Sequence, residues 1–221
     1  MFFQKKAITG ALALGLGVLT VACGQPKSAS DQPSSTANAE QAAASVDTAK
    51  KDCPKPAVLV QSSTVVPVTK ANYSEAETQT VFAKYITNVA TATCTGGLGT
   101  ILNLQKAADP KDRTVIRINF DTLYSWLILD LTTPATFTLP QTNGRYQSAM
   151  VVNGQGYVYV EKEPGDYTLT EDEVGSRYAL VAFRTGVNIQ DPEDVAQAQA
   201  LQAKLSVTQA NTGEYLQPNQ W

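Results

Sequence analysis

The second half of the chain consists of short segments rich in Val, Ile, Thr and aromatic residues, with turn residues between them. Short segments of this composition, bounded by turns, are typical of β-strands. We expect strands at residues 114–118, 123–131, 136–139, 146–152, 157–161 and 178–184. Asn153-Gly154 favours positive φ at two positions, so the strands on either side of it are predicted to form a hairpin.

An amphipathic helix is predicted before these strands. Ser74-Glu75-Ala76-Glu77 has the pattern of a capping box, in which Ser74 caps the helix and Glu77 reaches back to it. Apolar residues then recur at helical spacing and give the helix one apolar face. These residues are Val81, Phe82, Tyr85, Ile86 and Val89. The Gly96-Gly97-Leu98-Gly99 run should end the helix, which is then about 16 residues long.

Two further helical segments are predicted towards the C-terminus. Thr170-Glu171-Asp172-Glu173 favours a short helical turn that stops at Gly175. Asp191-Pro192-Glu193-Asp194 begins a final helix, because Pro suits its first position and acidic residues suit its first turn. Its inward residues are Val195, Ala198, Leu201 and Leu205. We therefore expect an α+β fold, mainly antiparallel β with a sandwich-like sheet, carrying an N-terminal amphipathic helix and a C-terminal helix.

The N-terminus has the three parts of a secretory signal. Lys5 and Lys6 precede an uncharged run of 16 residues, 7–22, which is shorter than the roughly 20 residues of a membrane-spanning helix. Leu19-Thr20-Val21-Ala22-Cys23 resembles the bacterial lipobox, although Thr20 stands where that pattern prefers Leu. The resemblance implies that Cys23 is acylated and becomes the first residue. The alternative is an ordinary cleaved signal with an incidental Cys.

These features predict the cellular location and the domain organisation of the chain. Residues 1–22 would be a signal peptide, 23–57 the lipidated Cys and a disordered polar tether, 58–210 a single β-rich domain, and 211–221 a C-terminal tail. Gly24, in place of an Asp that would resemble an inner-membrane retention signal, favours the outer membrane, facing the periplasm or the exterior. The membrane is therefore the expected partner, through acyl chains that bind at roughly 0.8 kcal/mol per buried CH₂.

The sequence contains three cysteines, Cys23, Cys53 and Cys94. If Cys23 carries the lipid, one pair remains in an oxidising compartment, which predicts a Cys53–Cys94 disulfide. Closing that loop stabilises a fold by about 4 kcal/mol in the chain-entropy model. Free thiols or a redox pair are the alternatives, and the spacing lacks the CxxC pattern of redox enzymes.

Charge and composition exclude several classes of function. Removing the signal leaves 15 basic and 20 acidic residues (17 − 2 against 20), a net charge of −5, and no basic cluster suited to nucleic acid. The chain has no His. Catalytic triads and imidazole-bound metals are therefore ruled out. We expect neither a metal ion nor a cofactor.

The densest polar cluster is Asn119-Phe120-Asp121-Thr122-Leu123-Tyr124-Ser125, followed by Leu129-Asp130-Leu131 and Gly144-Arg145-Tyr146. With Gly175-Ser176-Arg177-Tyr178 and the stretch from Arg184 to Asp191-Pro192-Glu193-Asp194, it resembles a known family, the domain of unknown function 1254. The resemblance extends over about residues 73–207. It implies a β-rich fold and little about mechanism.

The chain departs from the family pattern in two respects. Phe120 stands where the family often has Arg, so any anion contact made by that Arg is lost. Many relatives continue into a second domain, of unknown function 1214, which we expect this chain to lack.

A catalytic hypothesis pairs the carboxylates of Asp121 and Asp130, with Tyr124 and Arg145 orienting a substrate. Such pairs perform general acid–base chemistry on glycosides. However, nine residues of extended strand span about 30 Å, so the pair requires the chain to fold back.

A second hypothesis combines Asn119, Asp121, Tyr124 and Arg145 in one polar pocket for a small ligand. Alternatively, Asn119 and Asp121 cap a turn, Arg145 pairs with Asp121, and Tyr124 only packs. Four tyrosines could line a carbohydrate groove or simply stabilise the sheet. They are Tyr146, Tyr157, Tyr159 and Tyr178.

Three functions remain open at the level of sequence. The chain is a lipid-anchored envelope module that binds a small ligand or another envelope component, a His-free hydrolase or lyase that uses Asp121, Tyr124 and Arg145, or a purely structural envelope protein. The sequence does not predict an oligomeric state.

Overall fold

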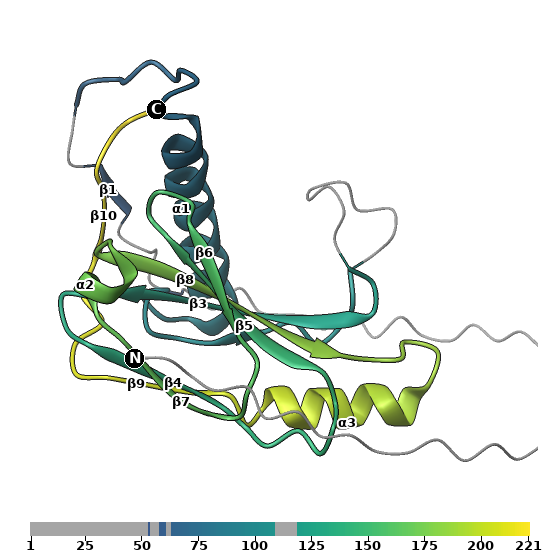
Figure 1. The fold of residues 1–221 in the computed structure, drawn as a ribbon. Helices are drawn as coiled ribbons and strands as arrows, with labels where there is room; N and C mark the ends of the chain where they lie inside the picture. Colours follow the sequence, from purple (N-terminus) through teal and green to yellow (C-terminus); the bar gives the residue numbers. More distant parts are fainter. Residues whose placement is uncertain (1–52, 54–57, 61–62, 109–118) are drawn as a thin grey trace, which may run out of the picture. The chain divides into compact units, whose positions relative to one another are not determined.

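The computed structural model describes Cys53 and residues 58–60, 63–108 and 119–221, all within the unit Thr48–Trp221 (Figure 1). The predicted signal, Cys23, most of the tether and the predicted strand at 114–118 lie outside the described residues.

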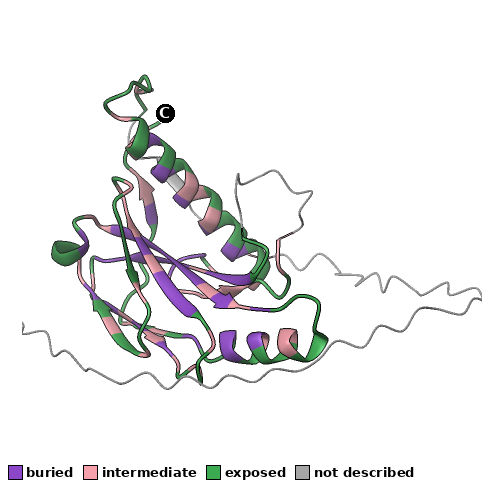
Figure 2. Cartoon of the chain, turned by 45° about the vertical axis from the view of Figure 1, so that its right-hand side comes forward, coloured by how far each residue is buried: buried purple, intermediate pink, exposed green. Residues whose placement is uncertain are grey.

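The larger of two antiparallel sheets has five strands in the order β2-β3-β8-β5-β6. Its strands are β2 (Leu102–Asn103), β3 (Thr122–Asp130), β8 (Tyr178–Gly186), β5 (Gln147–Asn153) and β6 (Val158–Glu161). Four of them are strands that the sequence predicts. β3 and β8 are buried along nearly their whole length, because side chains on both faces of these central strands are covered (Figure 2).

The predicted hairpin between β5 and β6 is present, but its turn differs from the expected one. The positive φ of the loop is at Gly156 (86°), two residues after Gly154. The Asn153 side chain accounts for this, since its Oδ1 accepts the N–H groups of Gln155 and Tyr157, both at 3.0 Å. A side-chain cap therefore shapes the loop instead of two left-handed residues.

The smaller sheet has the order β7-β4-β9 and packs on one face of the larger sheet. Its strands are β7 (Gly165–Leu169), β4 (Ala135–Leu139) and β9 (Ser206–Gln209). Strict alternation in β4 turns Ala135, Phe137 and Leu139 inward, where they meet Leu127, Phe183 and other residues of the larger sheet. The predicted sandwich-like α+β architecture is confirmed.

Helix α1 (Tyr73–Thr93) covers part of the opposite face of the larger sheet. The predicted apolar stripe is confirmed, with Phe82, Ile86 and Val89 buried against Ile128 and Leu180. The helix is longer than expected, at 21 residues, and it ends at Cys94, which adopts the left-handed conformation before the glycine run begins.

The predicted capping box at the start of α1 is wrong. The N-cap residue is Asn72, and the Ser74 hydroxyl donates to the carbonyl of Gln155 at 2.9 Å. Ser74 therefore ties the first turn of α1 to the β5–β6 loop. This long-range contact replaces the local cap that the sequence pattern favours.

The two C-terminal helices follow the prediction. In α2 (Glu171–Val174) the Thr170 hydroxyl accepts from the Glu173 N–H, and Gly175 ends the turn at φ 80°. In α3 (Pro192–Gln202) the Asp191 carboxylate accepts the N–H groups of Glu193 and Asp194. Ala198 of α3 packs on Leu123 and Val187.

The predicted C-terminal tail, residues 211–221, packs onto the domain. Its strand β10 (Tyr215–Gln217) pairs in parallel with β1 (Val58–Val60). Tyr215 is 2% exposed in the core beneath α1. A single aromatic residue in a polar segment carries no periodicity, so this packing could not be predicted from the sequence pattern.

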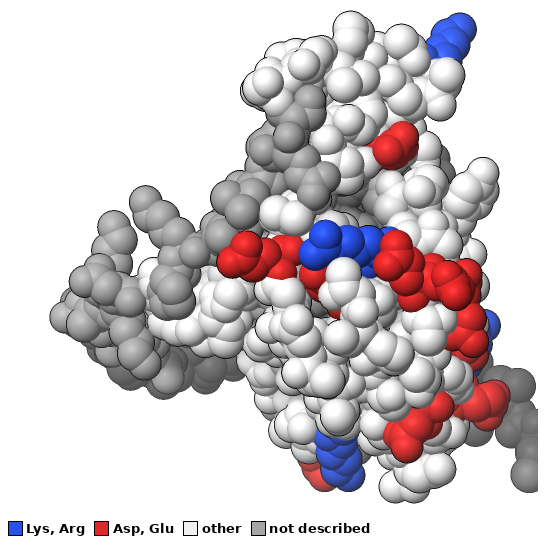
Figure 3. Space-filling view, turned by 90° about the vertical axis from the view of Figure 1, so that its left-hand side faces the viewer, with Lys and Arg blue, Asp and Glu red and all other residues white. Residues whose placement is uncertain are grey.

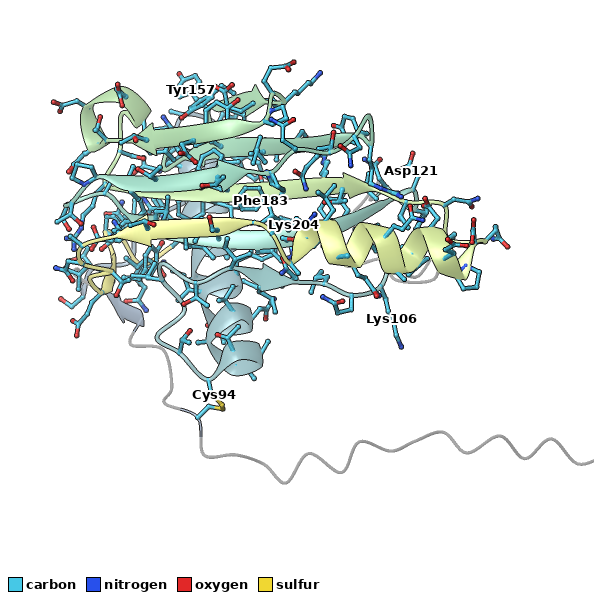
Figure 4. All side chains as sticks on the ribbon, turned by 90° about the horizontal axis from the view of Figure 1, so that it is seen from below. Cys94, Lys106, Asp121, Tyr157, Phe183 and Lys204 are labelled. Carbon is cyan, nitrogen blue, oxygen red and sulfur yellow. A yellow bond between two sulfur atoms is a disulfide. The ribbon has the colours of Figure 1, made fainter. Side chains whose placement is uncertain are left out.

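The predicted disulfide joins Cys53 to Cys94, with 4.8 Å between the two Cα atoms. It ties the N-terminal segment to the C-terminal end of α1 (Figure 4).

A candidate ligand-binding face on the larger sheet

Asn119 and Asp121 lie at the beginning of β3, where both are exposed. With Phe120 and residues 187–189 they line a shallow depression of about 450 Å³. The Asp121 carbonyl accepts the Val187 N–H at 2.8 Å, so this segment is fixed to the end of β8 (Figure 4).

Arg145 does not line this depression and is engaged in a salt bridge. Its Nη1 and Nη2 donate to the two carboxylate oxygens of Asp194 at 3.0 and 2.5 Å, and Nη1 also donates to the Gly186 carbonyl at 2.8 Å. The hydrogen bond from Arg145 lowers the pKa of Asp194 to about 2, helped by the backbone N–H of Asn188. The expected pairing of Arg145 with Asp121 is wrong, because α3 supplies a nearer acid.

The carboxylate-pair hypothesis is also wrong. β3 is one continuous strand, and Asp130 stands at the opposite end from Asp121, fully buried. Arg177 holds both of its oxygens, with Nε at 2.9 Å and Nη2 at 2.7 Å. The Asp130 carboxylate is therefore occupied within the fold.

A polar pocket of about 370 Å³ adjoins this ion pair. Glu75, Gln155, Glu171, Arg177 and Tyr215 are among its lining residues. Figure 3 shows acidic side chains on both sides of a basic group on the face that carries α2. Because Arg177 already holds Asp130, this pocket offers mainly carboxylates and amides.

Tyr124 belongs to a third surface, separate from the depression at Asp121 and the pocket at Arg177. Residues directly opposite one another in neighbouring strands share a face of the sheet. The register places Tyr124 of β3, Arg184 of β8 and Ser148 of β5 in one row. The next row contains Trp126, Ala182 and Met150. We call these two rows, with Thr122 and Tyr146 beside them, the Arg184 face.

The Arg184 face is on the same side of the sheet as α1, but α1 packs mainly on the neighbouring row of Ile128 and Leu180. Trp126, Met150 and Arg184 remain half-buried, and Tyr146 is 48% exposed. Part of this face is therefore open to solvent.

Arg184 has an unusual environment for a half-buried cation. Its guanidinium carbon lies 5.7 Å from the ring centroid of Tyr124. Its Nε is buried and has no hydrogen-bond partner, and among the described residues no carboxylate lies within salt-bridge distance of it. Arg145 and Arg177, the other arginines in the described ranges, each hold an aspartate.

The ring of Tyr124 belongs to a row of three aromatic side chains. Tyr124 stacks on Trp126, with ring centroids 5.4 Å apart and 10° between the ring planes. The ring centroid of Tyr85, in α1, lies 4.3 Å from that of Trp126. The Tyr124 hydroxyl accepts the Asn119 N–H at 3.4 Å. Burial, followed by the proximity of Tyr124, raises the pKa of Tyr85. The phenol of Tyr85 is therefore neutral at physiological pH.

Hydroxyl groups complete the face. The Tyr146 hydroxyl and the Ser148 Oγ are hydrogen-bonded at 2.9 Å. The Thr122 hydroxyl is buried without a partner, and alternation along β3 puts Thr122 on the same face as Tyr124. Native structures leave few buried polar groups unsatisfied, so Thr122 and the Arg184 Nε both indicate a site for an additional polar group.

A protein-family model, "Protein of unknown function (DUF1254)", matches residues 98–209 of the chain. The chain belongs to the DUF1254 family. No curated protein matches it significantly. Among solved structures, it is similar to the VPA0106 protein from Vibrio parahaemolyticus, with 16% identity and a TM-score of 0.49. That match covers 67% of this chain and 39% of the other, so the chain spans about two fifths of that protein's length.

The DUF1254 motif segments supply much of the Arg184 face. The Asn119–Ser125 segment contributes Thr122 and Tyr124, and the Gly144-Arg145-Tyr146 segment contributes Tyr146. Arg184 itself opens the last of the resembling stretches. Of the four predicted site residues, the structure brings Asn119 and Tyr124 together, and it places Arg145 in the salt bridge with Asp194.

Sequence reasoning did not single out Arg184 or Trp126 as site residues of this DUF1254 protein. A usable signal was present, because Arg184 is the charged residue of an otherwise apolar strand, YALVAFRTG. A charge in such a strand is costly unless it has a partner.

In the described part of this DUF1254 chain, no group of three or more acidic, Cys or His side chains is arranged to hold a metal ion. Among the described helices, none combines the length and apolarity needed to cross a membrane.

Proposed function

We propose that this DUF1254 protein is a small-ligand-binding module that is exported and held at the outer membrane by acyl chains on Cys23. The binding proposal rests on half-buried Arg184, which has no acidic partner among the described residues and lies over the ring of Tyr124, itself stacked on Trp126. A cation with aromatic neighbours and unsatisfied polar atoms is typical of a binding surface.

The catalytic alternative receives less support. General acid–base chemistry requires its groups within hydrogen-bond reach of one reacting centre. Arg145 is held by Asp194, and Asp121 lies in the depression beside residues 187–189. These two members of the hypothetical centre therefore line different surfaces.

The purely structural alternative also receives less support. In a structural role Arg184 would be expected to stabilise a partner, as Arg177 stabilises Asp130. Instead, its Nε loses hydration and gains no hydrogen bond in the fold.

The export and anchoring part of the proposal rests on the sequence, namely the basic start, the short apolar run and the lipobox-like segment at Cys23. The odd cysteine supports it, because the other two form the disulfide.

Fluorescence of Trp126 tests the binding proposal. The chain has two tryptophans, so Trp221→Phe leaves Trp126 as the reporter. The full-length protein, purified in detergent, is titrated with small metabolites of each charge class while its Tm is recorded. A ligand at about 100 times its Kd stabilises the native state by about 2.7 kcal/mol.

We expect at least one class of compound to change the Trp126 emission saturably and to raise the Tm. Absence of both effects for anionic, neutral and cationic compounds would contradict the binding proposal. The double variant Trp126→Phe/Trp221→Phe is the control for the fluorescence signal.

A further inference from the structure

We infer that the Arg184 face binds a small carboxylic acid built on a ring, with the carboxylate on the Arg184 guanidinium and the ring against Trp126. This inference rests on the proposed binding function and specifies its ligand.

The charge on this face indicates a single anionic group. Its two rows and flanking residues are neutral except for Arg184. A guanidinium offers a planar fork of donors that matches a carboxylate, and such charge-assisted pairs are the strong ones. The Nε of Arg184 has no acceptor in the fold, and among the described residues no carboxylate pairs with the guanidinium. An oxyanion on the accessible side of the guanidinium would supply the acidic partner that the fold does not.

A carboxylate fits this charge better than a phosphate monoester. A phosphate monoester carries close to two negative charges at neutral pH, and its sites commonly add a second cation or several backbone N–H groups. The described residues of the Arg184 face provide one cation and no helix N-terminus.

The aromatic residues define the rest of the ligand. Tyr124, Trp126 and Tyr85 form a continuous group of rings beside Arg184. Flat ligands with an apolar side stack on such rings, with an energy of about 0.5–1.5 kcal/mol beyond area burial for aromatic pairs. The hydrogen-bonded hydroxyls of Tyr146 and Ser148 lie in reach of polar substituents on a ring.

The spacing between the rows matches a small ring acid. Side chains two residues apart on one face of a strand are separated by about 7 Å. Arg184 is in the row of Tyr124, and Trp126 is in the next row. A carboxylate attached directly to a six-membered ring spans a distance of this order. Sugar acids and aromatic acids share this chemistry.

The experiment uses full-length Trp221→Phe protein, two pairs of matched probes, a phosphate probe and three variants. Glucuronate is compared with glucose, and benzoate with benzyl alcohol, while glucose 6-phosphate tests the phosphate. Arg184→Gln removes the cation and Arg184→Lys keeps the charge without the fork. Lys204→Gln, an exposed cation at the end of α3, is the matched control.

We expect at least one of the two acids to bind at least tenfold more tightly than its neutral counterpart and than glucose 6-phosphate. The stronger acid identifies a sugar or an aromatic ring as the natural class. Arg184→Gln should weaken that binding at least tenfold, Arg184→Lys should weaken it less, and Lys204→Gln should leave it within twofold. Melting curves of each variant show that the fold is retained.

Binding of neutral compounds that equals that of the acids, tighter binding of the phosphate, or insensitivity to Arg184→Gln would overturn this inference while leaving the proposed binding function intact. Failure of every probe, and of every compound in the wider screen, would overturn both.

Discussion

Arg177, directly before β8, and Arg184, within β8, have different environments. Arg177 forms a bidentate pair with the fully buried Asp130 and is 32% exposed. Arg184, seven positions along the chain, lies over the ring of Tyr124 and has no acidic partner among the described residues. The first arginine is held by an acid of the fold, and the second is the cation to which we assign the proposed ligand.

This contrast gives a prediction about stability. Arg177→Ala leaves the Asp130 carboxylate buried without its partner and should lower the free energy of unfolding by about 3 kcal/mol. Arg184→Gln removes a cation without a partner and should change it by less than about 1 kcal/mol. Urea unfolding of both variants measures the difference. A larger loss for Arg184→Gln than for Arg177→Ala would contradict these roles.

The Arg145–Asp194 pair predicts a pH dependence. The pKa of Asp194 is about 2 in the fold, below its ordinary value of 3.8. A depressed carboxyl pKa stabilises the fold above the ordinary value, and this contribution is lost as the pH falls towards the folded value. Stability should therefore decrease between about pH 4 and pH 2 with a component that Asp194→Asn lacks. Identical acid profiles for the two proteins would contradict the assignment.

At the residue scale, the sequence put Tyr124 and Asn119 in one polar cluster, and the two residues are in contact, but it predicted the wrong acidic partner for Arg145. The choice of partner for Arg145 depends on where α3 lies, 49 residues away, and no local pattern contains that information. Arg184 was recognisable only as a charge in an apolar strand, since its neighbours come from β3 and β5.

At the scale of single elements, local side-chain chemistry explains where most of the helices begin and end. Asp191 and Pro192 begin α3 and Thr170 begins α2, as predicted. The two errors, at the start of α1 and in the β5–β6 loop, meet at one place, where Ser74 donates to Gln155. Gly156 is required there, because an added Cβ would lie 2.4 Å from the Ser74 Oγ. The contact between α1 and the β5–β6 loop therefore overrides the local sequence preference of each.

The α3 cap is a testable element. Asp191→Ala removes the acceptor for two backbone N–H groups and should destabilise the protein by about 1 kcal/mol. Glu193→Gln, in the same turn and exposed, should cost only a few tenths of a kcal/mol. Equal losses in thermal unfolding would show that the cap contributes no more than the general charge of the turn.

At the scale of the whole molecule, the sequence predicted the fold class and five of the described strands, namely β3, β4, β5, β6 and β8, but not the strand order. Tyr124 pairs with Arg184 sixty residues later (184 − 124), with β4 to β7 between them along the chain. Hydrophobic patterns identify strands without identifying their partners. Short polar strands such as β9 and β10 were missed because little of their length is buried.

The disulfide acts on the whole domain. Its loop spans 41 positions, for which the chain-entropy model gives about 4 kcal/mol. The double variant Cys53→Ser/Cys94→Ser should lose stability of this order in urea unfolding. Unchanged stability would indicate that the bridge contributes nothing to this domain.

The proposed lipid anchor on Cys23 can be tested by cell fractionation. Cys23→Ser should move the protein from the membrane fraction to the soluble fraction of the cells that export it, because it removes the acyl chains. Cys53→Ser/Cys94→Ser serves as the control that removes cysteines without removing the anchor. Membrane association that persists in Cys23→Ser would contradict the lipoprotein proposal.

The side-chain Nε–H signal of Arg184 in ¹H–¹⁵N NMR spectra reports directly on ligand binding at this cation. Arg184→Lys assigns it among the signals of the five arginines. On addition of the tightest ring acid, we expect the Arg184 signal to shift saturably while those of Arg145 and Arg177 stay in place. A shift at Arg145 or Arg177 without one at Arg184 would contradict this prediction.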